Sequence, residues 1–583
     1  MVRSYLVKKF SRILDEQQKK RIVPLFFSMI IGAAFEVVGV SLMVPLVTSV
    51  TTPEIIENNS AIKKICDIMH IGTYKSFVLA CIFALIGIYV VKNVFLIFQN
   101  KLQANFVYGN RFATQQKLLH AFLSRDYEYY LNASSGEIIR AVQNDVSQAY
   151  RLFLNVLIML SDLVVSFALV ITILVIDWQM TLFVAAMLSL IMLIIVKLVR
   201  PKLVAAGLSN QKNVARTNGI LLQSIQGIKE IKVFSKEDFF ENNYENSGAR
   251  VIESEKLQSV LQIIPKMLIE MMSVCSMLAV FAIEIMLGKE VDSLLPALGA
   301  FAMAAVKLMP SANRIVTSFN LISYSQPALD KLLDNLEVLR AEKPLPAEHS
   351  VNPSESIKKN ISESIRLSNI SYCYPNTGKI VLEDATMEIP IGKSIGIVGP
   401  SGEGKTTAVD VILGLLKPQK GAVLADGEDV SSFCREWLSH IGYIPQSIFM
   451  MDASIKSNVA FGVAEEDIDE GRVWECLGMA HMEEFVKELP QGLDTFIGER
   501  GLRISGGQMQ RIGIARALYG NPDILIFDEA TSSLDNDTEL AVMDAVNSLH
   551  GKKTMIIIAH RLQTISGCDM VYRVENGKIL REK

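Results

Sequence analysis

The residues with the clearest potential for chemistry form a glycine-rich segment, which reads Gly399-Pro-Ser-Gly-Glu-Gly-Lys-Thr-Thr407. A largely apolar stretch, Lys393–Val398, precedes it and predicts a buried strand, and a helix-prone stretch, Thr407–Leu416, follows it. In this strand–loop–helix order, glycines let backbone N–H groups close around phosphate, and the dipole at the helix N-terminus favours negative charge. The segment therefore predicts a site for the phosphates of a nucleotide. A glycine-rich turn before an ordinary helix is the alternative.

Two side chains of this phosphate loop have roles that follow from their chemistry. The ammonium group of Lys405 is expected to reach the β- and γ-phosphates, and the hydroxyl of Thr406 is expected to ligate Mg²⁺. The predicted nucleotide-binding residues of the loop are Gly399, Ser401, Gly402, Glu403, Gly404, Lys405, Thr406 and Thr407.

A second apolar strand, Ile524–Phe527, ends in two carboxylates, Asp528 and Glu529. We expect Asp528 to hold Mg²⁺ through water, and Glu529 to polarise the water that attacks the γ-phosphate. An acidic pair that caps a helix after a core strand is the alternative. The phosphate loop upstream favours the nucleotide interpretation, and together the two segments predict Mg²⁺-dependent hydrolysis of ATP.

Between these segments lies Ile504-Ser-Gly-Gly-Gln508, with Gln510 and Arg511 after it. This stretch resembles the signature of the ATP-binding-cassette family, and the other landmarks of that family appear in the same order over residues 364–583. The resemblance implies an α/β P-loop nucleotide-binding domain of the ABC class, with ATP and Mg²⁺ as cofactors. It adds to the predicted binding residues Tyr374, Gln446, Ser505, Gly506, Gly507 and Gln508.

The same resemblance assigns individual roles. Tyr374 corresponds to the aromatic residue that stacks on adenine, with Tyr372 as the alternative, and His560 corresponds to the switch histidine. The implied catalytic residues are thus Glu529, His560 and Gln446, and the implied Mg²⁺ ligands are Thr406, Gln446 and Asp528. Further matches are the X-loop at 498–501 and the D-loop at 532–535. In this family one ATP lies between the phosphate loop of one cassette and the signature of another. Because the chain has a single cassette, we expect a half-transporter that works as a homodimer.

Composition indicates what kind of chain carries this cassette. Of 583 residues, 50% are hydrophobic and only 20% are charged, which is typical of a membrane protein and excludes disordered, collagen-like and disulfide-scaffold classes. The formal net charge of −4 gives no basic field, so we expect no nucleic-acid partner. The seven cysteines form no CxxC pair, and we expect them to be reduced.

Stretches long enough to cross a bilayer recur before position 340. The six predicted spans are Ile22–Val50, Phe77–Phe98, Val156–Ile176, Met180–Val199, Val260–Leu287 and Leu294–Phe319. Together they predict an exporter-type α-helical membrane domain at 1–340 with two long cytoplasmic extensions. A Pro- and Ser-rich linker is expected at 341–363, and the nucleotide-binding domain at 364–583. Apolar residues at helical spacing predict an external amphipathic segment at about 52–71, with an ordinary extracellular cap as the alternative.

Basic residues beside the spans predict the orientation. The first 21 residues carry seven Lys and Arg against two acidic residues, and segment 200–259 is also rich in Lys and Arg. We therefore expect a multi-pass protein of the inner cell membrane whose N-terminus and nucleotide-binding domain are cytoplasmic. By resemblance to exporters, coupling helices would lie near Asp126–Ser134 and Ser235–Asn243. Ordinary packing between long helices is the alternative.

Ionisable residues within the spans indicate the cargo, because each is costly in lipid unless it faces water or a partner. The basic candidates for binding substrate are Lys92, Lys266, Lys307 and Arg314, and the acidic residues of the spans are Glu36, Asp162, Glu270 and Glu284. Four charges of each sign also allow internal pairing, for example between Lys266 and Glu270 or between Glu36 and Lys92.

Three short segments, at 35–36, 264–266 and 307–318, resemble the lipid-linked oligosaccharide flippases of bacterial N-glycosylation (the PglK type). The cavity arginines of that family correspond here to Lys92, Lys266 and Lys307. Lysine keeps the charge but loses the bidentate fork that suits pyrophosphate. The resemblance implies ATP-driven export of a polyprenyl-(pyro)phosphate-linked oligosaccharide, a lipid-linked substrate in the membrane. The alternatives are an exporter of another lipid, drug or peptide, and a non-transporting regulator gated by ATP.

Overall fold

The computed structural model of the chain describes residues 9–41, 74–176, 197–286, 291–341, 361–375, 378–498, 503–529, 549–559 and 565–583, with a few single positions between them. The chain divides into two compact units. One unit contains residues 1–125 and 132–347, and the other contains residues 126–131 and 348–583.

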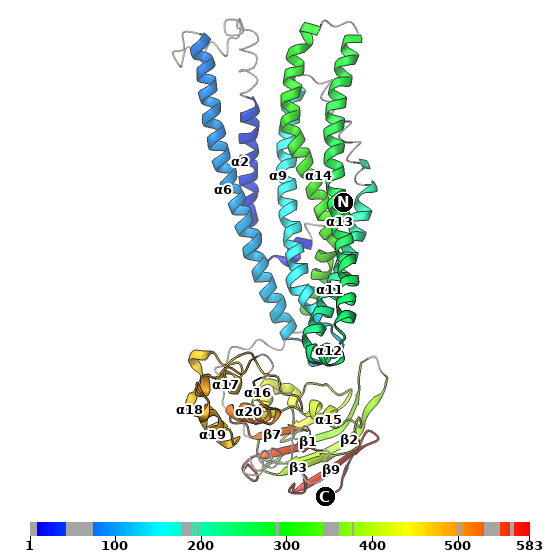
Figure 1. Ribbon diagram of the computed structural model, residues 1–583, viewed down its shortest axis with the longest axis vertical. Helices are drawn as coiled ribbons and strands as arrows, with labels where there is room; N and C mark the ends of the chain where they lie inside the picture. The colour runs from blue at the N-terminus through cyan, green and yellow to red at the C-terminus, as the bar shows by residue number, and fades with distance from the viewer. Residues whose placement is uncertain are drawn as a thin grey trace. The chain divides into compact units, whose positions relative to one another are not determined.

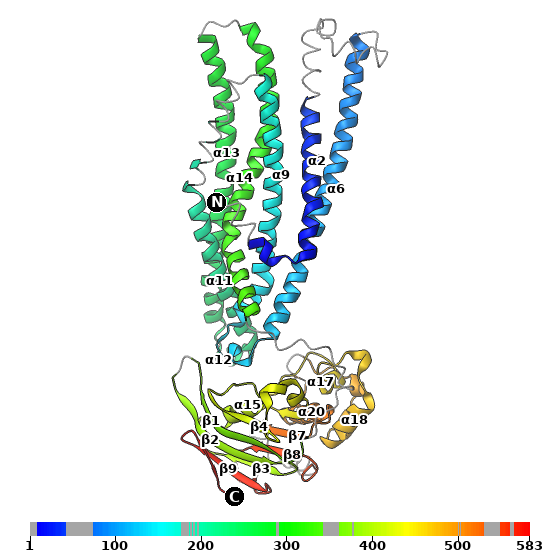
Figure 2. The same ribbon diagram turned by 180° about the vertical axis from the view of Figure 1, so that it is seen from behind.

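The first unit is built from long helices (Figure 1). In it, α2 packs beside α6, α9 beside α14, and α11 beside α13, as the view from behind also shows (Figure 2). Its elements are α2 (Glu16–Ser41), α6 (Tyr74–Leu123), α8 (Ser135–Ile139), the π-helical turn η1 (Arg140–Asp145), α9 (Val146–Ile176), α11 (Arg200–Gln226), α12 (Ile228–Phe234), α13 (Glu237–Met286) and α14 (Val291–Ala341).

Five of the six predicted spans fall on α2, α6, α9, α13 and α14, although residues 42–50 of the first span lie outside the described residues. Three of these helices continue well beyond the apolar stretches, because polar residues such as those at 99–123 extend a helix as readily as apolar ones do. Most of the span at 180–199, the external segment at 52–71 and most of the linker at 341–363 lie outside the described residues.

Among the described residues, the stretches Lys75–Leu123 and Ser135–Ile171 are long and apolar enough to cross a membrane. On α6, large apolar side chains such as Phe83, Val90, Val94 and Ile97 are exposed at helical spacing. A soluble monomer rarely exposes such a continuous apolar surface, and a helix that faces lipid does so along its length.

The second unit is an α/β cassette that also includes Asp126 and residues 127–131 of the short helix α7 (Tyr127–Asn132). Its strands are β1 (Ser364–Cys373), β2 (Ile380–Pro390), β3 (Ser394–Val398), β4 (Lys420–Ala425), β5 (Glu428–Asp429), β6 (Ile441–Ile444), β7 (Ile524–Asp528), β8 (Thr554–Ile558), β9 (Met570–Glu575) and β10 (Lys578–Arg581). Its other helices are α15 (Lys405–Ile412), α16 (Cys434–Ser439), α17 (Ile455–Val459), α18 (Glu470–Met479), α19 (Glu483–Glu488) and α20 (Gly506–Tyr519), with 3₁₀ turns η2 (Val430–Phe433), η3 (Glu465–Asp467) and η4 (Gly492–Asp494).

The strands form two sheets of different character. The order β2-β1-β4-β5 gives an antiparallel sheet, and the order β10-β9-β3-β8-β7-β6 gives a sheet that is parallel except for β10. Strands β3, β7 and β8 are buried along their whole length. Continuous apolar runs are typical of parallel strands that are covered on both faces.

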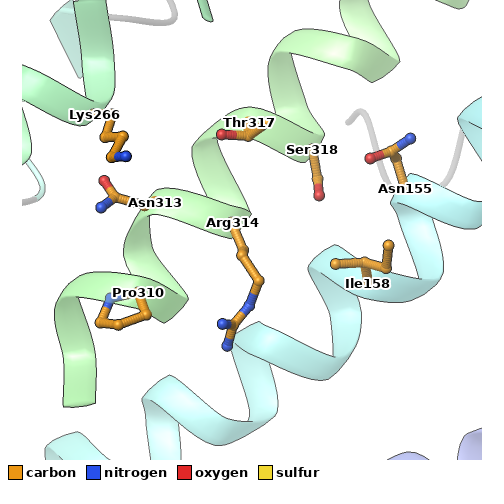
Figure 3. Close-up of a pocket in the computed structure, with 8 residues that line it drawn as sticks. All are labelled: Asn155, Ile158, Lys266, Pro310, Asn313, Arg314, Thr317 and Ser318. Carbon is orange, nitrogen blue, oxygen red and sulfur yellow. The ribbon is translucent and has the colours of Figure 1, made fainter. Parts of the chain in front are cut away.

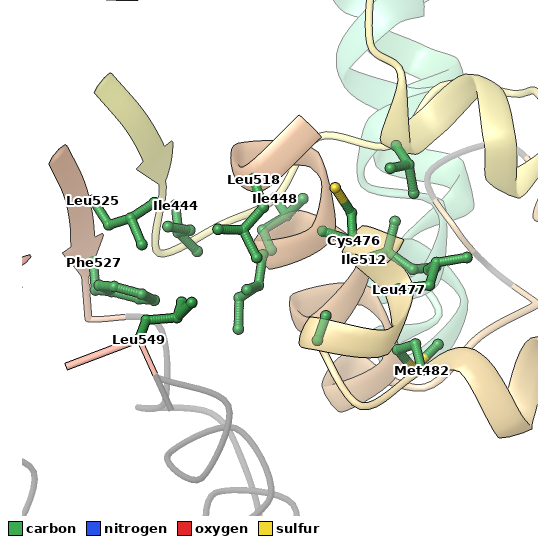
Figure 4. Close-up of a cluster of buried hydrophobic side chains, with 14 of the residues drawn as sticks. Ile444, Ile448, Cys476, Leu477, Met482, Ile512, Leu518, Leu525, Phe527 and Leu549 are labelled. Carbon is green, nitrogen blue, oxygen red and sulfur yellow. The ribbon is translucent and has the colours of Figure 1, made fainter. Parts of the chain in front are cut away.

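Two hydrophobic cores hold the cassette together. One lies between the antiparallel sheet, β3 and α15, where Trp437 is fully buried and donates its indole N–H to the carbonyl of Ile412 at 2.8 Å. The other joins β6 and β7 to α18 and α20 (Figure 4) through residues that include Ile444, Phe527 and Ile512. The second core fixes the signature helix α20 against the strand that carries Asp528.

Candidate nucleotide-binding site and membrane pocket

The cassette site is assembled at the carboxyl edge of the parallel sheet. Strand β3 leads into the phosphate loop, β6 is followed by Gln446, and β7 ends at Asp528 and Glu529. Strand β8 lies between β3 and β7, and β6 lies beside β7, so the three segments emerge at one edge. This is where open α/β sheets bind their ligands.

Backbone geometry explains two glycines of the phosphate loop. Gly399 has φ +149°, and a Cβ there would lie 2.2 Å from the carbonyl oxygen of Val574. Gly404 has φ +103°, and its Cβ would lie 2.8 Å from a methyl carbon of Val381. Only glycine allows this tight path. It directs the loop to the N-terminus of α15, where backbone N–H groups and the helix dipole favour phosphate.

The lysine, glutamine and glutamate predicted to act on ATP have well-defined hydrogen-bond partners. Lys405 is buried, and its ammonium group donates to the carbonyls of Gly399 at 2.9 Å and Pro400 at 3.0 Å. The amide of Gln446 donates to the carboxylate of Glu529 at 2.8 Å. Glu529 itself has φ +49°, an uncommon backbone conformation that is concentrated at active sites. Gln446 is therefore placed to orient the carboxylate that would polarise water.

Asp528 has the chemistry of a Mg²⁺ ligand. One carboxylate oxygen accepts from the hydroxyl of Tyr443 at 3.3 Å, and the other is buried without a hydrogen-bond partner among the described residues. Burial, and secondly the charge of Glu529, raise the pKa of Asp528. A divalent cation would compensate this buried charge, and with the oxygens of Thr406 and Gln446 the site offers the hard oxygen donors that Mg²⁺ prefers. Tyr443 lies in none of the sequence motifs, so its role beside Asp528 becomes visible only in the structure.

The structure distinguishes the two candidate aromatic residues. Tyr374 lines a pocket of about 480 Å³ together with Lys405, Gln446 and Glu529, and its hydroxyl lies 3.0 Å from that of Thr407. Tyr372 is fully buried, so its ring is not accessible to a base. The geometry therefore favours Tyr374 for stacking on adenine.

The remaining residues of the predicted site are placed as follows. Ser401, Gly402, Gly404, Thr406 and Thr407 line the same pocket. Glu403 faces away from it, because its carboxylate accepts from the backbone N–H of Asn576 at 2.7 Å. His560, residues 499–500 and the predicted D-loop lie outside the described residues.

The signature segment forms the N-terminus of α20. Ser505 accepts from the backbone N–H of Gln508, and Gln508 accepts from the backbone N–H of Ser505, which is a capping box. Of the residues that the structure describes, the set lining the nucleotide pocket does not include Ser505–Gln508. The two halves of the predicted ATP site are thus separate within one chain.

Comparison with known proteins agrees with this geometry. Residues 26–289 match the family model described as ABC transporter transmembrane region, and residues 382–532 match the one described as ABC transporter. Together the two matches cover well over half of the chain. The chain belongs to the ABC transporter family.

Relatives and a solved structure refine this assignment. The chain is 29% identical over 504 residues to an ATP-dependent lipid A-core flippase of Chromobacterium violaceum, covering 86% of this chain and 84% of that protein. It is 39% identical over 230 residues to ABC transporter B family member 22 of Arabidopsis thaliana, but spans only 19% of that longer protein. The structure of a bacterial Atm1-family ABC exporter with ATP bound shares the fold, with a TM-score of 0.74, 20% identity and coverage of 97% of this chain and 95% of that one. This ABC half-transporter thus has the exporter fold, and its ATP-binding domain implies ATP hydrolysis coupled to transport.

The membrane region of the half-transporter contains a pocket of about 530 Å³ that is lined mainly by residues with polar side chains (Figure 3). Its lining comes from α9, α13 and α14 and consists of Asn155, Ile158, Lys266, Pro310, Asn313, Arg314, Thr317 and Ser318. Sequence reasoning selected Lys266 and Arg314 but missed the amides and hydroxyls. The sequence pattern that could have revealed them is a set of four polar residues at 313, 314, 317 and 318. These form two pairs one helical turn apart on the same face of α14.

The two cations of this pocket differ in their partners. Arg314 forms a bidentate pair with Asp162 on α9, with Nη2–Oδ1 and Nε–Oδ2 distances of 2.7 Å and 3.0 Å. Asp162 is buried, and Arg314 neutralises its charge. Internal pairing, which the sequence left open, is therefore present here, and it joins two residues that the sequence analysis did not pair. Lys266 makes no ion pair with Glu270 in the described part of the chain, and its ammonium group points toward Asn313 (Figure 3).

The other predicted cargo residues, Lys92 and Lys307, are not among the described residues that line this pocket. Lys92 is buried on α6, where its ammonium group lies 5.0 Å from the centre of the Tyr89 ring. It is absent from the residues that line the described pocket. Lys307 lies on α14, and its side chain is outside the described part of the structure.

Proposed function

We propose that this ABC half-transporter is an ATP-driven flippase for a lipid whose oligosaccharide head group is joined to a polyprenyl chain by phosphate or pyrophosphate. The pocket between α9, α13 and α14 carries the proposal, because it sets one ammonium group among amides and hydroxyls. An ammonium group suits a phosphate, and amide and hydroxyl side chains suit the hydroxyls of a sugar.

The ion pair between Asp162 on α9 and Arg314 on α14 indicates which cation of the pocket would bind the phosphate. Because Asp162 compensates Arg314, Lys266 is the described cation of the pocket that is best suited to meet a phosphate. The buried Oδ1 of Asn313 has no hydrogen-bond partner among described residues and would accept from a sugar hydroxyl. The name of the Chromobacterium relative, a lipid A-core flippase, supports a lipid cargo.

The proposal includes the assembly and the orientation of the protein. Two copies would form a homodimer in the inner membrane, with the N-terminus and both cassettes in the cytoplasm. Each ATP and Mg²⁺ would lie between Lys405, Thr406, Gln446 and Asp528 of one copy and Ser505–Gln508 of the other. Separation of the signature from the described nucleotide pocket supports this arrangement. Glu529 would act on water, with Gln446 and His560 assisting. The proposed domains are residues 1–340, the linker 341–363 and the cassette 364–583.

The test is vectorial movement in proteoliposomes. A fluorescent polyprenyl-pyrophosphate-linked oligosaccharide should cross the bilayer when ATP and Mg²⁺ are added, and the E529Q variant should not move it. A polyprenyl phosphate without sugar and a hydrophobic drug serve as comparison cargoes. Movement of the drug alone would support a general exporter, and hydrolysis with no movement of any cargo would support an ATP-gated regulator.

A further inference from the structure

Helix α7 makes two polar contacts within the compact unit that holds the cassette. Asp126, just before the helix, accepts from the ammonium group of Lys417 at 2.7 Å. Glu128, in its first turn, accepts from the hydroxyl of Tyr372 at 2.9 Å. The first pair is exposed, whereas Tyr372 is fully buried. A buried phenol needs a hydrogen-bond acceptor, so the second contact is the one with structural consequences.

Tyr372 in turn contacts the aromatic residue of the nucleotide pocket. The rings of Tyr372 and Tyr374 are 5.2 Å apart between centres, with planes at 84°, a favourable edge-to-face arrangement. The hydroxyl of Tyr374 lies 3.0 Å from that of Thr407 in the first turn of α15. A continuous path therefore runs from Glu128 through both tyrosines to the helix that follows the phosphate loop.

A second side chain of α7 lies near the same aromatic residue. Burial, and then the charges of Asp410 and Tyr374, raise the pKa of Tyr127. Burial and the hydrogen bond to Glu128 raise the pKa of Tyr372 as well. Both phenols thus stay neutral, and the path acts through hydrogen bonding and ring packing.

We propose that Glu128 and Tyr372 are positioning residues that hold the ring of Tyr374 in the orientation that stacks on adenine. This rests on the proposed stacking role of Tyr374. Nucleotide affinity then depends on α7, and by thermodynamic reciprocity bound nucleotide strengthens the seating of α7. The path lies within one chain and needs no contribution from a second cassette.

The experiment measures ATP KM and kcat of the full-length transporter in nanodiscs. E128A is expected to raise KM about fivefold, the effect of one lost hydrogen bond, with kcat unchanged. E128Q keeps an acceptor oxygen and should stay within about twofold of wild type, and Y372F should match E128A. D126A is the matched control, because it removes the exposed contact of α7 and should leave KM unchanged. If D126A and E128A raised KM by the same factor, the proposal would be overturned, because any loss of α7 packing would then weaken nucleotide binding.

A double-variant comparison separates positioning from the role of Tyr374 itself. Y374A should raise KM, and adding E128A to Y374A should have no further effect, because the ring to be positioned is gone. If Y374A leaves KM unchanged, the stacking role fails and the path has no function. If Y374A raises KM but E128A does not, stacking stands and positioning by Glu128 is overturned. If E128A raised KM by the same factor in the wild-type protein and in Y374A, positioning by Glu128 would also be overturned.

Discussion

In the cassette, each predicted nucleotide-binding residue lies at the end of a strand or in the first turn of a helix. Residues of the same motif are also close together in the sequence. In the membrane region, the pocket takes its groups from the middle of α9, α13 and α14, which are far apart in the sequence. In the cassette, one buried oxygen of Asp528 has no hydrogen-bond partner among the described residues, whereas in the membrane region Asp162 compensates the charge of Arg314.

This difference indicates how each region uses buried charge. A nucleotide site can keep a buried carboxylate oxygen without a hydrogen-bond partner because a bound divalent cation would supply the compensating positive charge. A lipid-embedded region compensates most charges internally, because each is costly without a partner. A cation that lines a cavity and has no acidic partner is then the informative exception, and Lys266 is that residue in the described part.

Loss of Glu529 tests the cassette most severely. E529Q is expected to lower ATP turnover by about 100-fold or more, because the general base is removed while the groups that bind nucleotide remain. Nucleotide binding should be retained and a closed, ATP-bound dimer should accumulate. K405A is the contrasting variant and should weaken binding itself. ATPase assays with parallel binding measurements check both, and wild-type turnover in E529Q would remove this residue from the mechanism.

Breaking the Arg314–Asp162 pair tests compensation in the membrane region. R314Q should destabilise the protein by about 3 kcal/mol, because Asp162 remains buried without its partner. The R314Q/D162N double variant should recover most of the loss. Thermal unfolding in detergent measures this, with K266Q as a control that keeps the wild-type melting temperature. If R314Q abolished transport with no change in melting temperature, Arg314 would be a cargo ligand.

Neutralising Lys266 tests whether this cation of the membrane pocket binds phosphate. K266Q should reduce flipping of the phosphate-linked oligosaccharide about tenfold, the value of one charge-assisted hydrogen bond, and should impair it more than ATP hydrolysis. K266R keeps the charge and adds a fork that suits phosphate oxygens, so it should preserve flipping. Flipping and hydrolysis are compared on the same proteoliposomes. A stable K266Q protein that flips this lipid normally would refute phosphate binding at this position.

The smallest expected effect concerns Asp410 on α15. Burial, and then the charge of Asp528, raise the pKa of Asp410 to about 6. A carboxyl whose folded pKa is raised gives extra stability at low pH, and this is lost as pH rises through about 6. D410N should therefore stabilise the nucleotide-free protein at pH 7.5 by about 1 kcal/mol, since partial exposure reduces the effect, and by about half as much at pH 5. Melting temperatures at the two pH values check this, and a constant difference would contradict it.

The sequence by itself predicted the nucleotide-binding motifs of the cassette. The phosphate loop and the pair Asp528–Glu529 are contiguous motifs, and parallel strands bring their carboxyl ends to one edge whatever the loops between them contain. The spans were predictable for a similar reason, because each helix must be apolar over the thickness of the bilayer. The ends of helices such as α6 were not predictable in this way. Hydropathy shows which residues cross the bilayer, but it does not show where the backbone hydrogen bonding of the helix ends.

Only the tertiary structure decided which charges meet. Arg314 and Asp162 are 152 residues apart, and the sequence pattern indicated the pairs Lys266–Glu270 and Glu36–Lys92 instead. The choice between Tyr372 and Tyr374 likewise depended on which ring is exposed at the pocket. Periodicity places a residue on a face of its own helix or strand, but the neighbour of that face is set by the packing of elements distant in the chain. Charge compensation and exposure are properties of that packing.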